Sequence, residues 1–336
     1  MNLSAVFVTH DSEGCVAGAL ESVRRHFPEA ELLVVDNASN DRTREIVRAQ
    51  GGVRLVEQEE NLGFGRACNV GVDHSTGSHL FFVNPDARIV GIDSEAVGKL
   101  LNERPFGLVG PCFVSSDGGD RIVAGGLRPE RHWFFAYVSQ TFGLLRPREW
   151  PRRPPRGRRG AANWLGGAAV LVAREEFDRL GRFDPRFFLY YEDRELSARY
   201  RDAGLPIRST SAIRATHRGG SSSHAEGFRT APQGWALLGW IQYLSLRNGP
   251  KVAGRAGRLA LRTLQSLDLV LRMARPAAGL RLDRKRREVG MLLDFLEEVT
   301  GDAPTVRRQF CPDALRHLAR RSSLPPKALR RSDRAQ

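Results

Sequence analysis

Two adjacent acids follow a run of mostly aromatic residues in the second half of the chain. Residues 187–191 read FFLYY, and Glu192 and Asp193 come directly after them, where the pattern becomes helical. Apolar bulk beside a carboxyl group disfavours its charged form, and this is how a carboxylate becomes a usable general base. The same acids would also suit the first turn of a helix as simple capping residues. The local sequence leaves both interpretations open.

Polar residues also end two apolar segments within the first 90 residues. Asp36 and Asn37 end one of them, and Asn84 and Asp86 follow the other on either side of a proline. A carboxylate at position 36 could accept a hydrogen bond from the ring N–H of uracil, thymine or guanine. Asp86 would suit a hard divalent cation that is held together with substrate phosphates. Both segments are equally consistent with ordinary turns.

Two further segments combine glycine with residues that could contact a ligand. Asn61 precedes Gly63 in a glycine-rich stretch that enters a helical pattern, but the stretch lacks the dinucleotide spacing and the P-loop lysine. Trp164 precedes Gly166 and Gly167, and its ring could stack on a sugar or lie in the core. In both segments the glycines would allow close backbone approach to a ligand or would serve only as turns.

His217 lies at the end of another expected strand, over residues 212–216. A lone histidine is more often a surface or core residue than a ligand. Its role is therefore open at the level of local sequence.

The elements that must position these residues alternate between strand and helix. Near-continuous apolar strands separated by helices predict a mostly parallel α/β sheet that is covered on both faces. Ligands bind such sheets at the carboxyl ends of the strands, where Thr9, Asp36 and Asp86 are expected. The expected strands are 3–9, 31–36, 53–57, 79–84 and 168–173, and the expected helices are 13–26, 41–50 and 64–75.

The order of these segments resembles that of the inverting nucleotide-sugar glycosyltransferases of family 2, which have the Rossmann-like GT-A fold. The resemblance covers about residues 3–220 and is closest to rhamnosyltransferase-like members that glycosylate cell-envelope precursors. Six motifs in order are specific, although none is decisive alone. The motifs are VTHD at 8–11, VVDNASND at 34–41, NLGF at 61–64, NPD at 84–86, WLGG at 164–167 and FFLYYED at 187–193.

The resemblance implies a role for each candidate residue. Asp193 would be the general base, and Glu192 would shape its field. Asp86 would correspond to the last acid of the DXD motif and bind Mg²⁺ or Mn²⁺, with His217 approaching the metal or the diphosphate. The donor site would contain Thr9, Asp36, Asn37, Asn61, Gly63, Asn84 and Asp86, and the acceptor side would contain Trp164, Gly166 and Gly167.

Two positions depart from the family pattern. Asn84 stands where the DXD motif usually begins with an acid, so one carboxylate fewer is available to a metal. The first strand usually ends in Thr-aromatic-Asn, whereas here it ends in Thr9, His10 and Asp11. These departures put the metal dependence and the contacts of His10 and Asp11 with the nucleotide in doubt.

The donor is expected to be a nucleoside-diphosphate sugar, with dTDP-rhamnose favoured over a UDP-sugar such as UDP-galactofuranose. The acceptor is expected to be a carbohydrate or a lipid-linked precursor. A catalytically silent scaffold of the same fold is the alternative within the family, and the presence of both Asp86 and Asp193 argues against it.

The chain has 336 residues and a net charge of +14, which suggests an anionic partner. A nucleic-acid-binding protein is therefore a rival interpretation, but acids at successive strand ends would repel phosphate, so no nucleic acid is expected. The four widely spaced cysteines and the absence of a signal-like or membrane-spanning run predict a cytoplasmic protein. A basic C-terminal region could hold it on the inner face of the plasma membrane.

The expected domains are a catalytic domain over 1–225, a basic helical extension over 226–320 and a disordered tail over 321–336. The catalytic domain would comprise a nucleotide-sugar half over about 1–90 and an acceptor half over about 91–225. Residues 251–336 contain 20 Lys and Arg against 9 Asp and Glu. The leucines between 259 and 271 are broken by Arg262 and flanked by Arg258 and Arg272, as in basic helices that lie on anionic membranes.

Overall fold

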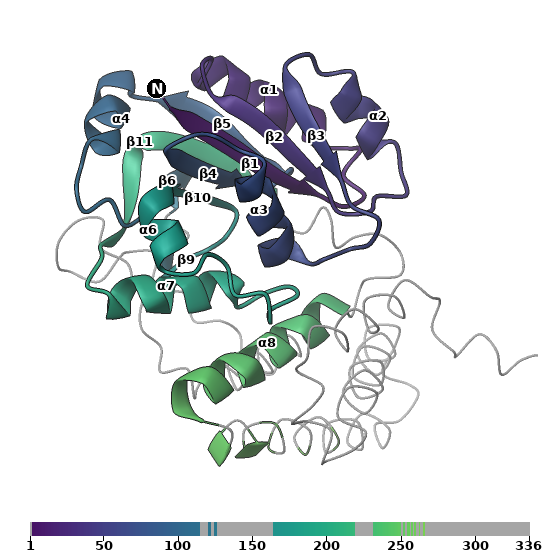
Figure 1. Cartoon of the computed structure of the whole chain (residues 1–336), viewed down its shortest axis with the longest axis vertical. Helices are drawn as coiled ribbons and strands as arrows, with labels where there is room; N and C mark the ends of the chain where they lie inside the picture. The colour runs from purple at the N-terminus through teal and green to yellow at the C-terminus, as the bar shows by residue number, and fades with distance from the viewer. Residues whose placement is uncertain are drawn as a thin grey trace, which may run out of the picture. The chain divides into compact units, whose positions relative to one another are not determined.

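The computed structural model describes residues 2–114, 120–121, 124–125, 164–218 and 231–249, and eight positions between 251 and 265 (Figure 1). The chain forms two compact units. The first comprises residues 1–130, 147–185 and 192–222, and the second comprises residues 131–146, 186–191 and 223–336. The expectations for the tail over 321–336, and for the extension beyond residue 265, lie outside the described residues.

The strands and helices expected in the first 90 residues form close to their expected positions. The apolar segments of β1, β2 and β4 are almost fully buried, whereas β3 at the edge of the sheet is half-buried or exposed, and the amphipathic segments between the strands become helices. The strands are β1 (Leu3–Thr9), β2 (Glu31–Asp36), β3 (Val53–Glu57) and β4 (His79–Val83), and the helices are α1 (Val16–His26), α2 (Thr43–Arg48) and α3 (Phe64–Asp73).

The rest of the first unit adds strands on the far side of β4 and three more helices. The strands are β5 (Ala87–Ile92), β6 (Leu108–Val114), β7 (Asp120–Arg121), β8 (Ala124–Gly125), β9 (Trp164–Leu165), β10 (Ala169–Ala173) and β11 (Ile207–His217). The helices are α4 (Ser94–Leu101), α6 (Arg174–Arg179) and α7 (Glu192–Asp202).

The described strands of the main sheet lie in the order β3-β2-β1-β4-β10-β6-β11-β5, with β7 beside β6. Strands β3, β2, β1 and β4 are parallel, as the alternation of strands and helices predicts. Strand β10 is antiparallel to both of its neighbours, β4 and β6, and β5 is antiparallel to β11. The sheet is therefore mixed beyond β4, as is common in large sheets.

Helices cover both faces of this sheet, and each face has its own hydrophobic cluster. Alternate residues of a strand point to opposite faces, so Ala5 and Phe7 of β1 belong to one cluster, whereas Val6 and Val8 belong to the other. Helices α1, α2 and α4 contribute to the first cluster, and α3, α6 and α7 contribute to the second (Figure 1). The sheet is thus held between two helical layers, and α3 and α7 share one of them.

The second unit contains helix α8 (Ala231–Asn248), which packs on part of the aromatic segment that precedes Glu192. The rings of Phe188 and Trp235 lie 4.4 Å apart, and those of Tyr191 and Tyr243 lie 5.8 Å apart. The aromatic residues therefore help to form the core of the second unit. No helix in the part of the chain that the structure describes is long and apolar enough to cross a membrane.

Candidate active site

Asp86 and His217 meet although 131 positions separate them in the sequence. Strand β11 pairs antiparallel with β5 in a register that places His217 opposite Ala87. His217 Nε2 consequently lies 3.1 Å from Asp86 Oδ1, and the Arg218 N–H donates to the Asp86 carbonyl. Asp86 is buried, whereas His217 is partly exposed. The pair thus presents a carboxylate and an imidazole at one place in the fold.

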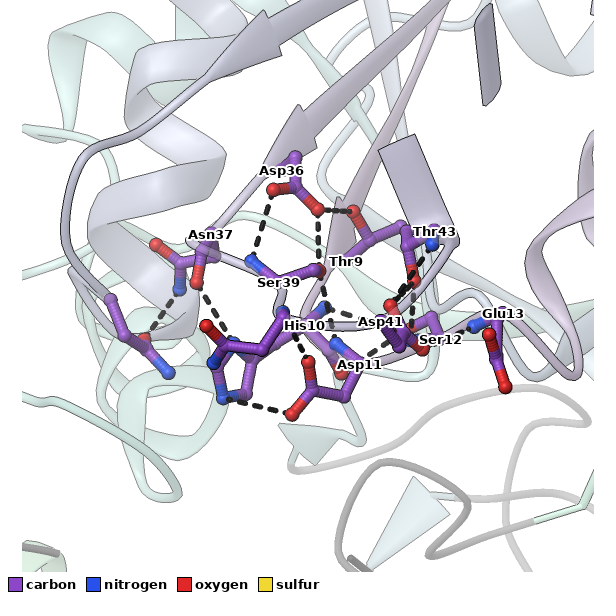
Figure 2. A network of polar contacts seen from close by, with 12 residues as sticks. Thr9, His10, Asp11, Ser12, Glu13, Asp36, Asn37, Ser39, Asp41 and Thr43 are labelled. Carbon is purple, nitrogen blue, oxygen red and sulfur yellow. Dashed lines mark hydrogen bonds and ion pairs between the residues drawn. The ribbon is translucent and has the colours of Figure 1, made fainter. Parts of the chain in front are cut away.

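Asp36 is the centre of a polar network at the carboxyl ends of β1 and β2 (Figure 2). Its carboxylate accepts hydrogen bonds from Thr9 Oγ1 at 3.1 Å, from Ser39 N and Oγ at 3.0 and 2.5 Å, and from Arg44 Nε at 2.6 Å. Asp36 has no exposed surface. In this structure the carboxylate therefore holds the loop after β2 in shape, and Ser39 and Arg44 are partners that the sequence did not identify.

Asn37 connects this loop to the segment that enters α3. Its Nδ2 donates to Asn61 Oδ1 at 2.7 Å, and its Oδ1 accepts from the Leu62 N–H at 2.8 Å. Asn61 Oδ1 also accepts from the N–H of Gly63, whose φ of 83° favours glycine. The structure thus brings Thr9, Asp36, Asn37, Asn61 and Gly63 together in one network.

The partly exposed polar side chains at this edge include those of His10 and Asp11. His10 Nδ1 lies 2.9 Å from the Asn37 carbonyl oxygen, and its Nε2 lies 3.9 Å from Asp11 Oδ2 (Figure 2). Asp11 Oδ1 accepts from the Asn40 N–H, and the backbone of Asp11 is left-handed, with a φ of 48°. The two residues that depart from the family pattern are therefore integral to this strand edge.

Glu192 and Asp193 begin helix α7 directly after two residues with left-handed backbones. Tyr190 and Tyr191 have φ values of 67° and 72°, which are unfavourable for side chains of this size. Such backbone strain is concentrated at functional sites in many proteins. This turn directly precedes the first turn of α7 in the sequence, and the sequence contained no glycine to signal it.

Both oxygens of the Asp193 carboxylate are held by backbone N–H groups. Oδ2 accepts from Gly167 at 3.1 Å, and Oδ1 accepts from Arg194 at 2.7 Å. Burial raises the pKa of Asp193 above its ordinary value, while the positive charge of Arg194 and these hydrogen bonds act in the opposite direction. The residue as a whole is only partly buried.

Glu192 has a different environment from its neighbour. It is buried, and its Oε2 has no hydrogen-bond partner. Burial, followed by repulsion from Asp193, raises the pKa of Glu192 to about 8. The Cys68 thiol of α3 lies close enough that the Glu192 charge adds to the effect of burial in raising the pKa of Cys68. Glu192 is therefore neutral at pH 7, while Asp193 has several groups that stabilise its charge.

The Trp164–Gly167 segment lies against the first turn of α7. Gly166 follows β9, and the N–H of Gly167 supplies the bond to Asp193. A largely apolar cavity lies behind this contact, and Asp193 forms part of its wall. The cavity is lined by Phe82, Leu108, Leu165, Gly167, Val170, Phe183, Asp193, Leu196 and Ser197. Low polarity on this side of Asp193 agrees with the raised pKa.

Asn84 links the Asp193 region to the turn that carries Asp86. Its N–H donates to the Ala168 carbonyl at 2.9 Å, so the end of β4 is joined to the residue after Gly167. This arrangement follows from the antiparallel pairing of β10 with β4, which the sequence did not predict. The turn that carries Asn84 and Asp86 is thereby hydrogen-bonded to Ala168. Ala168 follows Gly167, whose N–H binds Asp193.

Within the described residues, no group of three or more His, Cys, Asp or Glu side chains is arranged to hold a metal ion. Asp86 and His217 alone supply two donor atoms 3.1 Å apart. A divalent cation that takes its other ligands from phosphate oxygens and water requires only one or two protein side chains. The donor set thus fits a cation that arrives with a diphosphate better than a cation bound by protein alone.

The sequence is similar to those of known glycosyltransferases. Residues 4–153 match the model of glycosyl transferase family 2. The N-acetylglucosaminyl-diphospho-decaprenol L-rhamnosyltransferase of Mycobacterium tuberculosis (strain ATCC 25618 / H37Rv) is 28% identical over 201 residues, which are 52% of this chain and 61% of that protein. The dTDP-rhamnosyl transferase RfbF of Shigella flexneri is 23% identical over 230 residues, which are 66% of this chain and 71% of that protein.

Two solved structures share the fold. GalNAc-T7 with UDP, GalNAc and Mn²⁺ superposes with a TM-score of 0.52 at 15% identity, covering 92% of this chain and 58% of that one. The mannosyltransferase PcManGT from Pyrobaculum calidifontis, in complex with GDP-Man and Mn²⁺, has a TM-score of 0.50 at 16% identity, covering 96% and 86%. Both have the GT-A fold that the sequence predicted.

Proposed function

We propose that this chain, whose residues 4–153 match glycosyl transferase family 2 and which has the GT-A fold, transfers a sugar from a nucleoside diphosphate to a hydroxyl group, with inversion at the anomeric carbon. The favoured donor is dTDP-rhamnose, and the favoured acceptor is a lipid-linked or polysaccharide precursor of the cell envelope. The names of the mycobacterial and Shigella relatives support this choice. The chain spans 61% of the mycobacterial relative.

The observation that carries the proposal is the environment of Asp193. Its carboxylate is held by two backbone N–H groups, lies in the wall of an apolar cavity and has a raised pKa. Those features suit a general base, because a carboxylate with higher proton affinity accepts a hydroxyl proton more readily. The neighbouring Glu192, neutral at pH 7, adds no second negative charge beside it.

In the proposed reaction, Asp193 takes the proton of the acceptor hydroxyl while that oxygen bonds to the anomeric carbon. The bond from the anomeric carbon to the diphosphate oxygen breaks, and its electron pair leaves with the nucleoside diphosphate. Attack and departure occur on opposite faces of the sugar, so the configuration inverts. Groups that stabilise negative charge on the departing diphosphate would lower the barrier.

Asp86 and His217 are the residues that would hold Mg²⁺ or Mn²⁺ at the diphosphate. Such an ion supplies positive charge that stabilises the leaving group. Asn84 would contribute an amide in place of the family's first acid. In a second version of the site, the His217 imidazole would itself contact the diphosphate without a metal, so metal dependence distinguishes the two versions.

The network around Asp36 would form the nucleotide end of the donor site. Thr9, Asp36, Asn37, Asn61 and Gly63 hold one another in place there. Asp36 would act mainly through loop shape, because a base N–H could reach it only by displacing one of its present donors. This site would accept uridine or thymidine, and UDP-galactofuranose is the alternative donor.

The test is turnover by Asp193→Asn with a panel of nucleotide sugars and lipid-linked acceptors. We expect donor binding to persist and turnover to fall by at least about 100-fold, the lower range for loss of a general base. Asp202→Asn, at the exposed C-terminal end of the same helix, is the matched control. Near-normal turnover in Asp193→Asn would exclude Asp193 as the general base. If Glu192→Gln were the inactive variant instead, the role of general base would pass to Glu192.

We further propose that the second unit docks on an anionic membrane surface. Val252 and Leu259 are 42% and 47% exposed, although both are apolar. Both positions are helical, and a spacing of seven is the spacing of residues on one side of an α-helix. Lys251, Arg255 and Arg262 are exposed beside them. Exposed apolar and basic residues on one helical face are typical of helices that lie in membrane interfaces.

Co-sedimentation with liposomes that contain anionic lipids tests this docking. We expect binding at low salt that falls at high salt, since each basic residue contributes roughly 1 kcal/mol and salt screens it. Leu259→Ser combined with Arg255→Gln should weaken binding. Val90→Ser is the control, because Val90 is 49% exposed in the first unit. A full-length protein that does not bind these liposomes at low salt would refute the docking.

A further inference from the structure

The Trp164–Gly167 segment and the first turn of α7 are joined at three points. The guanidinium carbon of Arg194 lies 4.1 Å from the ring centroid of Trp164. The N–H of Leu165 donates to Ser197 Oγ at 3.4 Å, and the N–H of Gly167 donates to Asp193 Oδ2 at 3.1 Å. Two short segments about 30 positions apart in the sequence are therefore held in one register, with Asp193 between them.

The Arg194 side chain is confined by its stacking on Trp164. A guanidinium over an indole ring is attracted by the ring's negative face, and the attraction grows when the pair is partly removed from water. Both residues are partly exposed here, so the stack lies at the surface of the site. The arginine follows Asp193 directly, and its charge favours the ionised carboxylate. Stacking on Trp164 restricts the rotamers of Arg194 and so keeps the guanidinium from turning toward solvent.

The other titratable groups in this region are Glu192 and residues of α3. Glu192 on the same helix repels it whenever both are charged. On α3, the Cys68 thiol faces Glu192, and the Arg66 Nε donates to the Pro185 carbonyl. The segment from Trp164 to Gly167 carries no charge. The charge of Arg194 opposes the effect of burial on the pKa of this carboxylate.

We infer that Arg194 is a positioning residue that keeps Asp193 ionised for proton acceptance, and that Trp164 acts by holding the Arg194 guanidinium in place. This inference rests on the proposed function, in which Asp193 is the general base. It reassigns Trp164, which the sequence placed on the acceptor side, to a supporting role for the base. It also explains why Gly167 and Trp164 belong to one segment: the first holds the carboxylate and the second holds the cation.

The pH dependence of kcat/KM tests the inference. In Arg194→Gln, the acid limb should move to higher pH by about one unit, in line with the loss of a nearby opposite charge. Trp164→Leu should move the limb in the same direction by less, and Arg194→Lys should stay near the wild type because the charge remains. Arg201→Gln, near the end of the same helix, is the control and should leave the limb unchanged.

A measurement without turnover separates the inference from the proposed function. The Asp193 carboxyl can be titrated by ¹³C NMR in protein labelled at aspartate, with Asp193→Asn identifying its signal. A higher pKa in Arg194→Gln or in Trp164→Leu supports the inference even if no acceptor has been found. Two variants are used so that poor folding of one does not prevent the test.

Two results would overturn specific parts of the argument. If Arg194→Gln and Trp164→Leu lower kcat but leave both the acid limb and the Asp193 titration unchanged, the stack is only structural and the inference is wrong. If the wild-type protein transfers no sugar from any donor while the Asp193 titration shifts as expected, the proposed function fails and the electrostatic role of Arg194 stands.

Discussion

Glu192 should destabilise the folded protein increasingly as the pH rises. Its side chain is 5% exposed, and its Oε2 has no hydrogen-bond partner. Burial and the Asp193 charge raise its pKa from the ordinary 4.5 to about 8. The folded state therefore holds a proton that the unfolded chain releases above pH 4.5. The variant Glu192→Gln keeps the shape of the protonated acid and cannot ionise.

The sign and size of the effect follow from proton linkage. Below pH 4.5 both states bind the proton, so the raised pKa costs nothing. Between pH 4.5 and about 8 only the folded state binds it, and stability falls as pH rises. Each pH unit in this window corresponds to about 1.4 kcal/mol. Between pH 4.5 and pH 7, the cost to the wild type reaches about 3 kcal/mol, and the Glu192→Gln variant avoids it.

The assay is urea unfolding of wild type and Glu192→Gln at pH 5, 6, 7 and 8. The advantage of the variant in free energy of unfolding should grow steadily with pH. Glu175→Gln is the matched control, because Glu175 is an exposed glutamate in the first turn of α6. If the difference between Glu192→Gln and wild type is the same at pH 5 and pH 8, Glu192 is not held neutral and the reasoning fails.

Three further predictions concern other parts of the fold and site. Asp36→Asn weakens a carboxylate that now serves Thr9, Ser39 and Arg44, and calorimetric or urea unfolding should show a loss of about 2–3 kcal/mol. Gly71→Ala would place a Cβ 2.4 Å from Val6 Cγ1 and should cost about 1–3 kcal/mol, whereas Gly98→Ala meets nothing within 4 Å and should be neutral or stabilising. Asp86→Ala should weaken nucleoside-diphosphate binding chiefly when Mn²⁺ is present, and a wild type whose calorimetric binding is insensitive to EDTA would show that no required metal binds there.

The sequence was sufficient to predict the strands and helices of the first 90 residues. Strands β1, β2 and β3 begin and end at the residues that their apolar runs predicted, and β4 ends one residue early. This accuracy has a simple cause, since strands buried on both faces are continuous apolar runs that polar residues interrupt at each end. The residue types at those ends, including Asp36 and Asp86, were also evident from the sequence.

The sequence did not show the direction of the later strands or which strands they pair with. The run at 169–173 reads AVLVA and is buried throughout, so its pattern is the same for a parallel and an antiparallel strand. Strand β5 directly follows β4 in the sequence yet pairs with β11 at the far end of the sheet order. Local pattern encodes burial, whereas pairing depends on which segments meet after the chain has folded.

By itself, then, the sequence determined the fold class, the motif order and the chemical types at Asp86, Glu192 and Asp193. Only the tertiary structure decided which neighbours those groups have. It brought His217 to Asp86, surrounded the buried Asp36 with four donors, left one oxygen of Glu192 without a partner and stacked Arg194 on Trp164. The reason is that a side chain's ionisation and hydrogen bonding depend on neighbours that are distant in the sequence, and no local spacing records them.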